Sequence, residues 1–233
     1  LSPGSAIHAH AGILFLKRLI SRIRYGVAVA LVNVAVALAV FGPGVAAAEP
    51  TRILALGDSL TAGYGLERTD SFPVQLQRAL NRQGIDAVVS NAGVSGDTSA
   101  GGRARLAWVL AEKPALAIIE LGANDGLRGL EPASTSANLD AMLTRLAAAR
   151  VAVLLAGMKA PPNLGSEYST KFDAIFPRLA RKHGVAFYPF FLDGVAARPE
   201  LNQEDGIHPN ALGVAVIVER ILPHVKALIA RRR

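Results

Sequence analysis

Ser59 stands where a strand could deliver a nucleophile. An apolar run from Ile53 to Leu56 stops at Gly57, and Asp58 and Ser59 follow at once. A buried strand is rigid and the loop after it exposes the next side chains, so this position suits a serine that attacks a substrate. The same residues could instead only cap a turn or a helix, as Asp and Ser often do. A nucleophilic role therefore requires a base, an orienting acid and an oxyanion site elsewhere in the chain.

His208 is the candidate base among the five histidines of the chain. The other four fall in an N-terminal leader, at a predicted helix end or in the last predicted helix: His8, His10, His183 and His224. Asp205 precedes His208 by three residues, so its carboxylate can reach one ring nitrogen and leave the other for Ser59. The alternative is that Asp205 caps a turn and His208 is a loop residue before Pro209.

Oxyanion donors are also present in the sequence. Gly93 can offer a backbone N–H to which a substrate comes close, and Asn124 can offer a side-chain N–H. Ser59 can add its own N–H. Each of the first two residues could instead be an ordinary turn residue.

The elements that must position these side chains are strands and helices in alternation. Short apolar runs rich in Ile, Val and Leu predict buried parallel strands at 52–56, 87–90, 116–121, 151–156 and 185–188. Helical patterns follow at 72–82, 99–110, 135–149, 170–183 and 210–229. This order predicts an α/β fold: a flavodoxin-like, three-layer α/β/α sandwich around a five-stranded parallel sheet. Because ligands bind beyond the carboxyl ends of such strands, the polar segments that follow each strand are expected to meet at one edge.

Composition restricts the classes of function. The 233 residues carry a net charge of +7 and no cysteine, which excludes disulfides, Cys-zinc sites and thiol nucleophiles. No basic stripe with interleaved aromatic residues is present, so we expect no nucleic acid partner.

The first 48 residues read as an exported leader. A basic segment at 17–24 precedes an apolar run at 27–40, a Gly-Pro-Gly break and the small residues 45–48. This pattern predicts a signal peptide cut near Ala48, with a hydrolase domain at 49–233 and a periplasmic or secreted location. The alternative is an uncleaved anchor, which would be the protein's one contact with a membrane. Residues 1–16 could belong to an over-extended gene start.

Four segments in order resemble the GDSL, or SGNH, hydrolase family: GDSL at 57–60, NAGVSGDT at 91–98, GAND at 122–125 and DGIHP at 205–209. The α/β-hydrolase pattern fits less well, because Thr61 replaces the last glycine of its Gly-x-Ser-x-Gly elbow. Within the family, the stretches 122–129, 164–179 and 187–210 are similar to periplasmic arylesterases, acyl-CoA thioesterases I and lysophospholipases L1. The resemblance implies Ser59 as nucleophile, His208 as base and Asp205 as orienter. It also implies Ser59 N–H, Gly93 N–H and Asn124 as oxyanion donors, with neither metal nor cofactor.

The resemblance points to a serine esterase that acts on esters or thioesters of lipophilic acyl groups, including lysophospholipids. Because it follows the fourth strand at the same edge, the segment 158–168 is expected to form the acyl pocket, with Met158, Pro161, Pro162 and Tyr168 as its candidate walls. Two alternatives remain open from the sequence: a carbohydrate O-acetylesterase, and an exported binding module that keeps the fold without catalysis.

Overall fold

The computed structural model describes residues 17–18, 20–22, 24–25 and 49–231. Contacts divide the chain into two units, Leu1–Ala48 and Glu49–Arg233. In the first unit the described residues are helical and exposed; the predicted apolar run and cleavage site lie outside the described residues. Among the helices that the structure describes, none has the length and apolar character needed to span a membrane.

A five-stranded parallel sheet forms the centre of the second unit. Its strands are β1 Thr51–Gly57, β2 Ala87–Gly93, β3 Leu116–Glu120, β4 Ala152–Ala156 and β5 Ala186–Tyr188. They lie in the order β2-β1-β3-β4-β5, and each neighbouring pair is parallel. This order makes the junction of β1 and β3 the point where the winding reverses, which is where such sheets bind ligands. The predicted fold class is confirmed.

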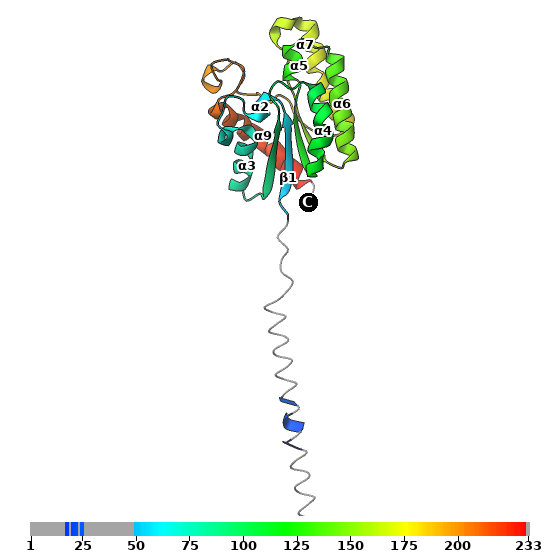
Figure 1. The fold of residues 1–233 in the computed structure, drawn as a ribbon, viewed down its shortest axis with the longest axis vertical. Coiled ribbons are helices and arrows are strands. Elements are labelled where there is room, and N and C mark those ends of the chain that lie inside the picture. Colours follow the sequence, from blue (N-terminus) through cyan, green and yellow to red (C-terminus); the bar gives the residue numbers. More distant parts are fainter. Residues whose placement is uncertain (1–16, 19, 23, 26–48, 232–233) are drawn as a thin grey trace, which may run out of the picture. The chain divides into compact units, whose positions relative to one another are not determined.

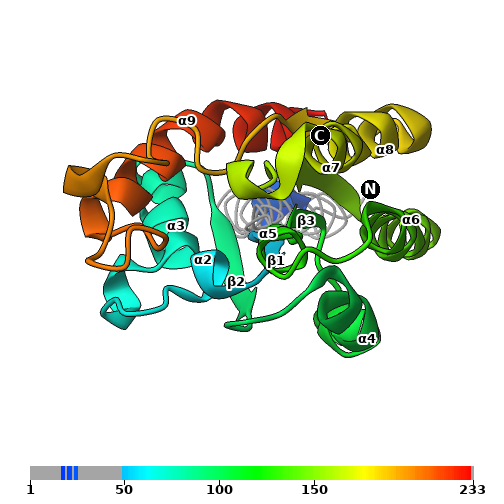
Figure 2. The ribbon, with the colours of Figure 1, turned by 90° about the horizontal axis from the view of Figure 1, so that it is seen from above.

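Helices cover both faces of this sheet, as Figures 1 and 2 show. On one face, α3 (Phe72–Arg82) packs against α9 (Ala211–Ala230); on the other, α4 (Ser99–Val109), α6 (Pro132–Ala148) and α8 (Ile175–His183) form a row. The central strands supply the core between these layers, and the side chains from Ile53 to Leu56 are fully buried. Burial on both faces explains why these strands read as continuous apolar runs.

One predicted helix is two helices in the structure. The segment 170–183 divides into α7 (Gly165–Asp173) and α8, with Ala174 between them. Pro177 explains the interruption, because it has no N–H to donate to the carbonyl of Asp173, four residues earlier. Two short helices that the sequence did not predict, α2 (Ser59–Ala62) and α5 (Ala123–Leu127), begin directly beyond β1 and β3.

Candidate active site

Ser59 is the first residue of α2, two positions beyond the end of β1. Asp58 caps this helix, because its Oδ1 accepts a hydrogen bond of 3.0 Å from the Leu60 N–H. Thr61 occupies the position of the missing elbow glycine, and its hydroxyl donates to Glu120 Oε2 over 2.7 Å. The capping role that the sequence left open for this segment thus belongs to Asp58, and the Ser59 side chain is left for the site.

The three residues predicted as nucleophile, base and orienter come together in one hydrogen-bonded row. Ser59 Oγ lies 2.9 Å from His208 Nε2, and His208 Nδ1 lies 2.6 Å from Asp205 Oδ2. Ser59 and His208 are separated by 149 residues in sequence, and the sheet edge joins them. The geometry is that of a serine hydroxyl whose proton can pass to an oriented imidazole.

Asp205 is held in its ionised form. Its Oδ1 accepts the backbone N–H groups of Ile207 and His208, both at 2.9 Å, and its Oδ2 meets the His208 ring. These hydrogen bonds, with the His208 N–H first among them, lower the pKa of Asp205 to about 2. A carboxylate that stays charged at this place can stabilise the imidazolium that forms when His208 takes a proton.

Asn124 lies in the first turn of α5, at the end of β3, and half-buried. Its Nδ2 donates to Asp58 Oδ2 over 3.2 Å, which fixes the amide plane and leaves the second N–H of the group for a ligand. Burial raises the pKa of Asp58 to about 6, against the opposing effect of the Leu60 and Asn124 hydrogen bonds. Asp58 therefore positions the Asn124 amide as well as capping α2.

Gly93 does not lie where an oxyanion donor is needed. It ends β2 in register with Gly57, and its N–H already donates to Asn91 Oδ1 over 2.9 Å. A methyl group at Gly93 would lie 2.2 Å from the backbone nitrogen of Ala62, so this glycine allows α2 to pack on the strand. The prediction of Gly93 as a donor is wrong, because the strand runs three residues further than the predicted 87–90.

Gly96, three residues further along the chain, offers what Gly93 lacks, which is an available backbone N–H at the cavity. It lines the same cavity as Ser59, Asn124 and His208, and its φ of +81° is one that glycine adopts without strain. Its N–H donates no hydrogen bond to another described residue. A signal for this residue was present in the sequence, since a Gly-Asp pair shortly precedes a helix both at 57–58 and at 96–97.

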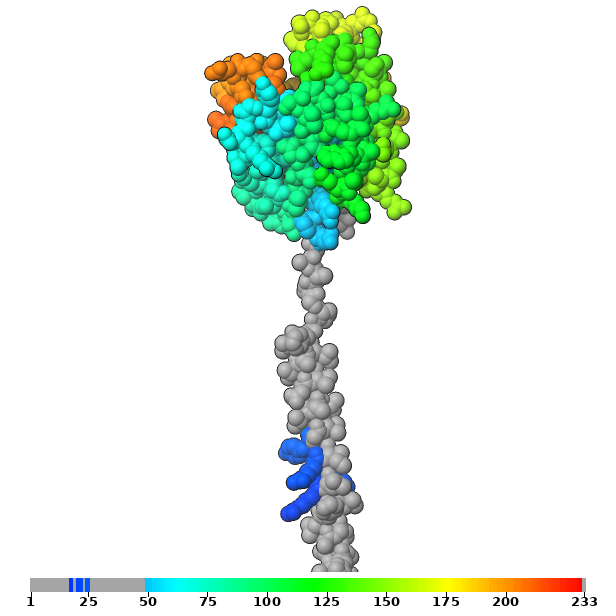
Figure 3. Space-filling model, in the orientation of Figure 1, coloured from blue at the N-terminus to red at the C-terminus, as the bar shows by residue number. Residues whose placement is uncertain are grey.

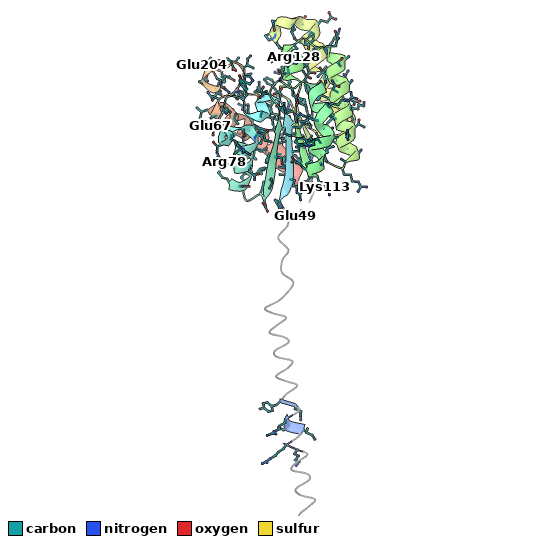
Figure 4. All side chains as sticks on the ribbon, viewed as in Figure 1. Glu49, Glu67, Arg78, Lys113, Arg128 and Glu204 are labelled. Atoms are coloured by element: carbon teal, nitrogen blue, oxygen red, sulfur yellow. The ribbon has the colours of Figure 1, made fainter. Side chains whose placement is uncertain are left out.

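Ser59 and His208 line an apolar cavity of about 470 Å³. Beside the polar residues just described, its walls come from five separate segments and include Leu60, Tyr64, Leu127, Met158, Pro161, Phe190 and Ile207. The Tyr64 ring lies 4.6 Å from the His208 ring, centre to centre. Figure 3 shows the second unit hollowed at its top, between the orange and the yellow-green segments. Glu204 and Arg128 lie on opposite sides of that opening in Figure 4.

The predicted pocket residues divide into two groups. Met158 and Pro161 line the cavity, and Pro162 and Tyr168 do not. Tyr168 turns its hydroxyl to the carbonyl of Leu130 over 2.7 Å, so it joins α7 to the segment after α5. All four residues were predicted to share one wall because they are close in sequence. The short helical turn Pro162–Leu164 separates the last two from the cavity.

Glu120 is a buried acid beside Asp58, and it was not among the residues predicted for the site. It ends β3, is fully buried, and its Oε2 accepts from the Asp58 N–H as well as from Thr61. Burial and the nearby Asp58 raise its pKa well above the usual value. A charged residue type in an otherwise apolar strand was the signal that could have found it. No group of three or more potential metal ligands occurs among the residues that the structure describes.

Comparison with known proteins agrees with this geometry. Residues 55–216 match the model of the GDSL-like lipase/acylhydrolase family. Esterase TesA of Pseudomonas aeruginosa is 43% identical over 178 residues, which are 76% of this chain and 89% of TesA. Thioesterase 1/protease 1/lysophospholipase L1 of Escherichia coli K12 is 41% identical over 165 residues, 70% of this chain and 78% of that protein.

A solved structure supports the same assignment. AlinE4, described as an SGNH-hydrolase family esterase, is 49% identical and superposes with a TM-score of 0.66, over 77% of this chain and 96% of AlinE4. The family model covers most of the chain, and the relatives exceed two-fifths identity over most of their own length. The chain therefore belongs to the GDSL-like lipase/acylhydrolase family and is an enzyme that hydrolyses esters.

Proposed function

We propose that this protein hydrolyses esters of lipophilic acyl groups through a Ser59 acyl-enzyme. The observation that carries the proposal is the row from Ser59 Oγ to His208 to Asp205, with separations of 2.9 and 2.6 Å, whose first two residues line an apolar cavity. A nucleophile alone, or a cavity alone, would leave the reaction class open.

In the first half of the reaction, Ser59 Oγ attacks the ester carbonyl while His208 Nε2 takes the hydroxyl proton. Asp205 holds the ring so that this nitrogen faces the serine, and its charge stabilises the imidazolium. The tetrahedral intermediate collapses when His208 returns the proton to the leaving alcohol. Water then attacks the acyl-enzyme, with His208 again as the base, and the carboxylic acid leaves.

Three N–H groups are available for the negative oxygen of that intermediate. The Ser59 N–H lies in the first turn of α2, where no helical carbonyl precedes it. The Gly96 N–H and the Asn124 Nδ2 line the same cavity. Gly96 thus takes the role that the sequence analysis gave to Gly93.

The cavity and the relatives together support the substrate class. Its apolar walls fit an alkyl or aryl chain, and a volume of about 470 Å³ far exceeds the needs of an acetyl group. The relatives named esterase, thioesterase and lysophospholipase favour the same class over a carbohydrate O-acetylesterase. Export through the predicted leader would take the enzyme away from cytoplasmic acyl thioesters, so we rank oxygen esters above thioesters.

The test is a panel of p-nitrophenyl esters from acetyl to palmitoyl, with a lysophospholipid, on the unaltered enzyme. We expect kcat/KM to rise beyond the acetyl ester and 1 mM EDTA to leave it unchanged. A preference for acetyl alone would overturn the proposed substrate class. Failure of a fluorophosphonate to label Ser59 would overturn the acyl-enzyme.

A further inference from the structure

Arg105 contacts the segment 92–97, which includes Gly96, and takes no part in the reaction steps proposed for Ser59 and His208. It projects from α4, and its side chain is only 19% exposed. All three nitrogens of its guanidinium group donate hydrogen bonds: Nε to Asp97 Oδ2 at 2.6 Å, Nη1 to the Ala92 carbonyl at 2.7 Å and Nη2 to the Gly57 carbonyl at 2.9 Å. The planar guanidinium group of an arginine can hold three acceptors in a fixed geometry, whereas the ammonium group of a lysine cannot.

The acceptors of Arg105 belong to two segments of the site: the end of β1, which leads to Ser59, and the segment 92–97, which includes Gly96. Gly57 is the last residue of β1, two positions before Ser59, and Asp97 directly follows Gly96. The Gly57 carbonyl also accepts the Val94 N–H over 3.1 Å, and the Asp97 N–H donates to the Val94 carbonyl over 3.0 Å. The turn 94–97 is thus fixed to the end of β1 through Arg105 and Val94.

Charge gives Arg105 a second role at this place. Asp97 is buried to a similar degree, with 17% of its side chain exposed, and it directly follows Gly96 in the chain. A carboxylate without a partner there would oppose the negative charge that develops on the substrate oxygen. The ion pair with Arg105 removes that opposition.

We propose that Arg105 is a positioning residue for ester hydrolysis, which fixes the Gly96 N–H relative to Ser59 and neutralises Asp97 beside the oxyanion site. The inference rests on the proposed function of the Ser59 site. It predicts that Arg105 acts on the transition state and leaves binding of the ground-state substrate unchanged.

The experiment compares Arg105→Lys, Arg105→Gln, Asp97→Asn and the double variant Arg105→Gln/Asp97→Asn. Arg103→Lys is the matched control, because Arg103 lies on the same helix, is exposed and contacts Asn138. Each variant is measured for kcat, KM, Tm and Ki. The two inhibitors are an alkyl trifluoromethyl ketone, which mimics the tetrahedral intermediate, and a fatty alcohol of equal chain length, which occupies only the ground-state site.

We expect Arg105→Gln to lower kcat by about 10²-fold and Arg105→Lys by about 10-fold, with KM unchanged within about twofold. The Ki of the ketone should rise in parallel with the loss of kcat, and the Ki of the alcohol should not. Adding Asp97→Asn to Arg105→Gln should restore about 3- to 10-fold, because the unpaired carboxylate is removed. A purely structural role would lower Tm and shift both inhibitors alike.

Normal kcat in Arg105→Lys and Arg105→Gln, or equal changes in the Ki of both inhibitors, would overturn the proposal. If the Arg105 variants do not fold, Asp97→Asn decides, since it is isosteric and leaves the two carbonyl contacts in place. Unchanged kcat and ketone affinity in Asp97→Asn would then refute the positioning role. Absence of ester hydrolysis by the unaltered enzyme would instead refute the proposed function itself.

Discussion

Two Asp–His pairs occur in this molecule with the same separation and different surroundings. Asp205 meets His208 over 2.6 Å beside Ser59, and Asp140 meets His183 over 2.6 Å on α6 and α8. At the first pair, the second ring nitrogen faces the Ser59 hydroxyl. At the second, the nearby Ser136 hydroxyl accepts a hydrogen bond of 3.0 Å from Arg178 instead.

The two carboxylates also differ in what lowers their pKa. Asp205 is stabilised by the peptide N–H groups and ring of its own loop, whereas Asp140 is stabilised first by Lys182, at 2.7 and 2.8 Å, and then by His183. A lysine that shares the carboxylate makes the second pair part of a three-residue ion network. An Asp–His contact therefore indicates catalysis only where the free ring nitrogen meets a nucleophile beside a cavity.

The largest expected difference concerns the two serines. Ser59→Ala should lower kcat/KM for p-nitrophenyl butyrate by about 10⁴-fold or more, because the acyl-enzyme cannot form. Ser136→Ala should retain full activity. Turnover by Ser59→Ala at the rate of the unaltered enzyme would refute the nucleophile assignment.

The two histidines should differ almost as strongly. His208→Ala is expected to reduce kcat by about 10⁴-fold, and Asp205→Asn by about 10²- to 10⁴-fold, since the first removes the base and the second its orientation. His183→Ala and Asp140→Asn should leave kcat within about twofold. Steady-state kinetics with the four purified variants would show this contrast. Equal losses of kcat at both pairs would refute the assignment of catalysis to the Asp205–His208 pair.

A third contrast sets Asn124 against Asn138, which lies on α6 and donates to Ser99 Oγ over 3.1 Å. Asn124→Ala should lower kcat by about 10²- to 10³-fold with little change in KM, as the loss of one oxyanion donor does. Asn138→Ala should have no comparable effect on kcat. A change confined to KM in Asn124→Ala would mean that the residue binds substrate and not the transition state.

The pH profile of the reaction should be independent of the second pair. We expect kcat/KM to fall as the pH drops through about 6, because Asp58, with its pKa raised to about 6 by burial, becomes protonated there and no longer holds the Asn124 amide as a carboxylate. Asp205, with its pKa lowered to about 2, stays ionised over that range and contributes nothing to the decline. His183→Ala should give the same profile as the unaltered enzyme, and a flat profile from pH 5 to 8 would contradict the dependence on Asp58.

The smallest expected effect is on stability at the second pair. The pKa of Asp140 lies below its ordinary value of 3.8, so its contribution to the free energy of unfolding is present above that value and is lost as the pH falls further. Asp140→Asn should lower Tm at pH 7 by only about 1 to 2 °C, as for an exposed ion pair. Thermal unfolding of the unaltered enzyme and of Asp140→Asn at pH 7 and pH 3 measures this effect. The difference in Tm between the two should be smaller at pH 3.

Much of the fold and part of the site could be predicted from the sequence. The alternation of apolar runs and helical patterns was sufficient for the parallel sheet, because strands buried on both faces leave a plain signal. Ser59, Asn124, Asp205 and His208 could be placed at one edge of the sheet, because they lie in segments that leave the carboxyl ends of parallel strands. The structure brings their side chains together there. The division of 170–183 into two helices was missed although Pro177 marked it.

What the sequence by itself determined is which residue types reach the sheet edge and in what order. Only the tertiary structure decided which backbone N–H is free there, because this depends on where strand pairing ends and where α2 packs. Gly93 lies under α2 with its N–H engaged, and Gly96 lies in the cavity with its N–H available. The contacts of Arg105 with Asp97, Ala92 and Gly57 were equally hidden, since they join parts of the chain up to 48 residues apart. The order of the strands in the sheet brings Arg105 and its acceptors together, and no local sequence pattern indicates that order.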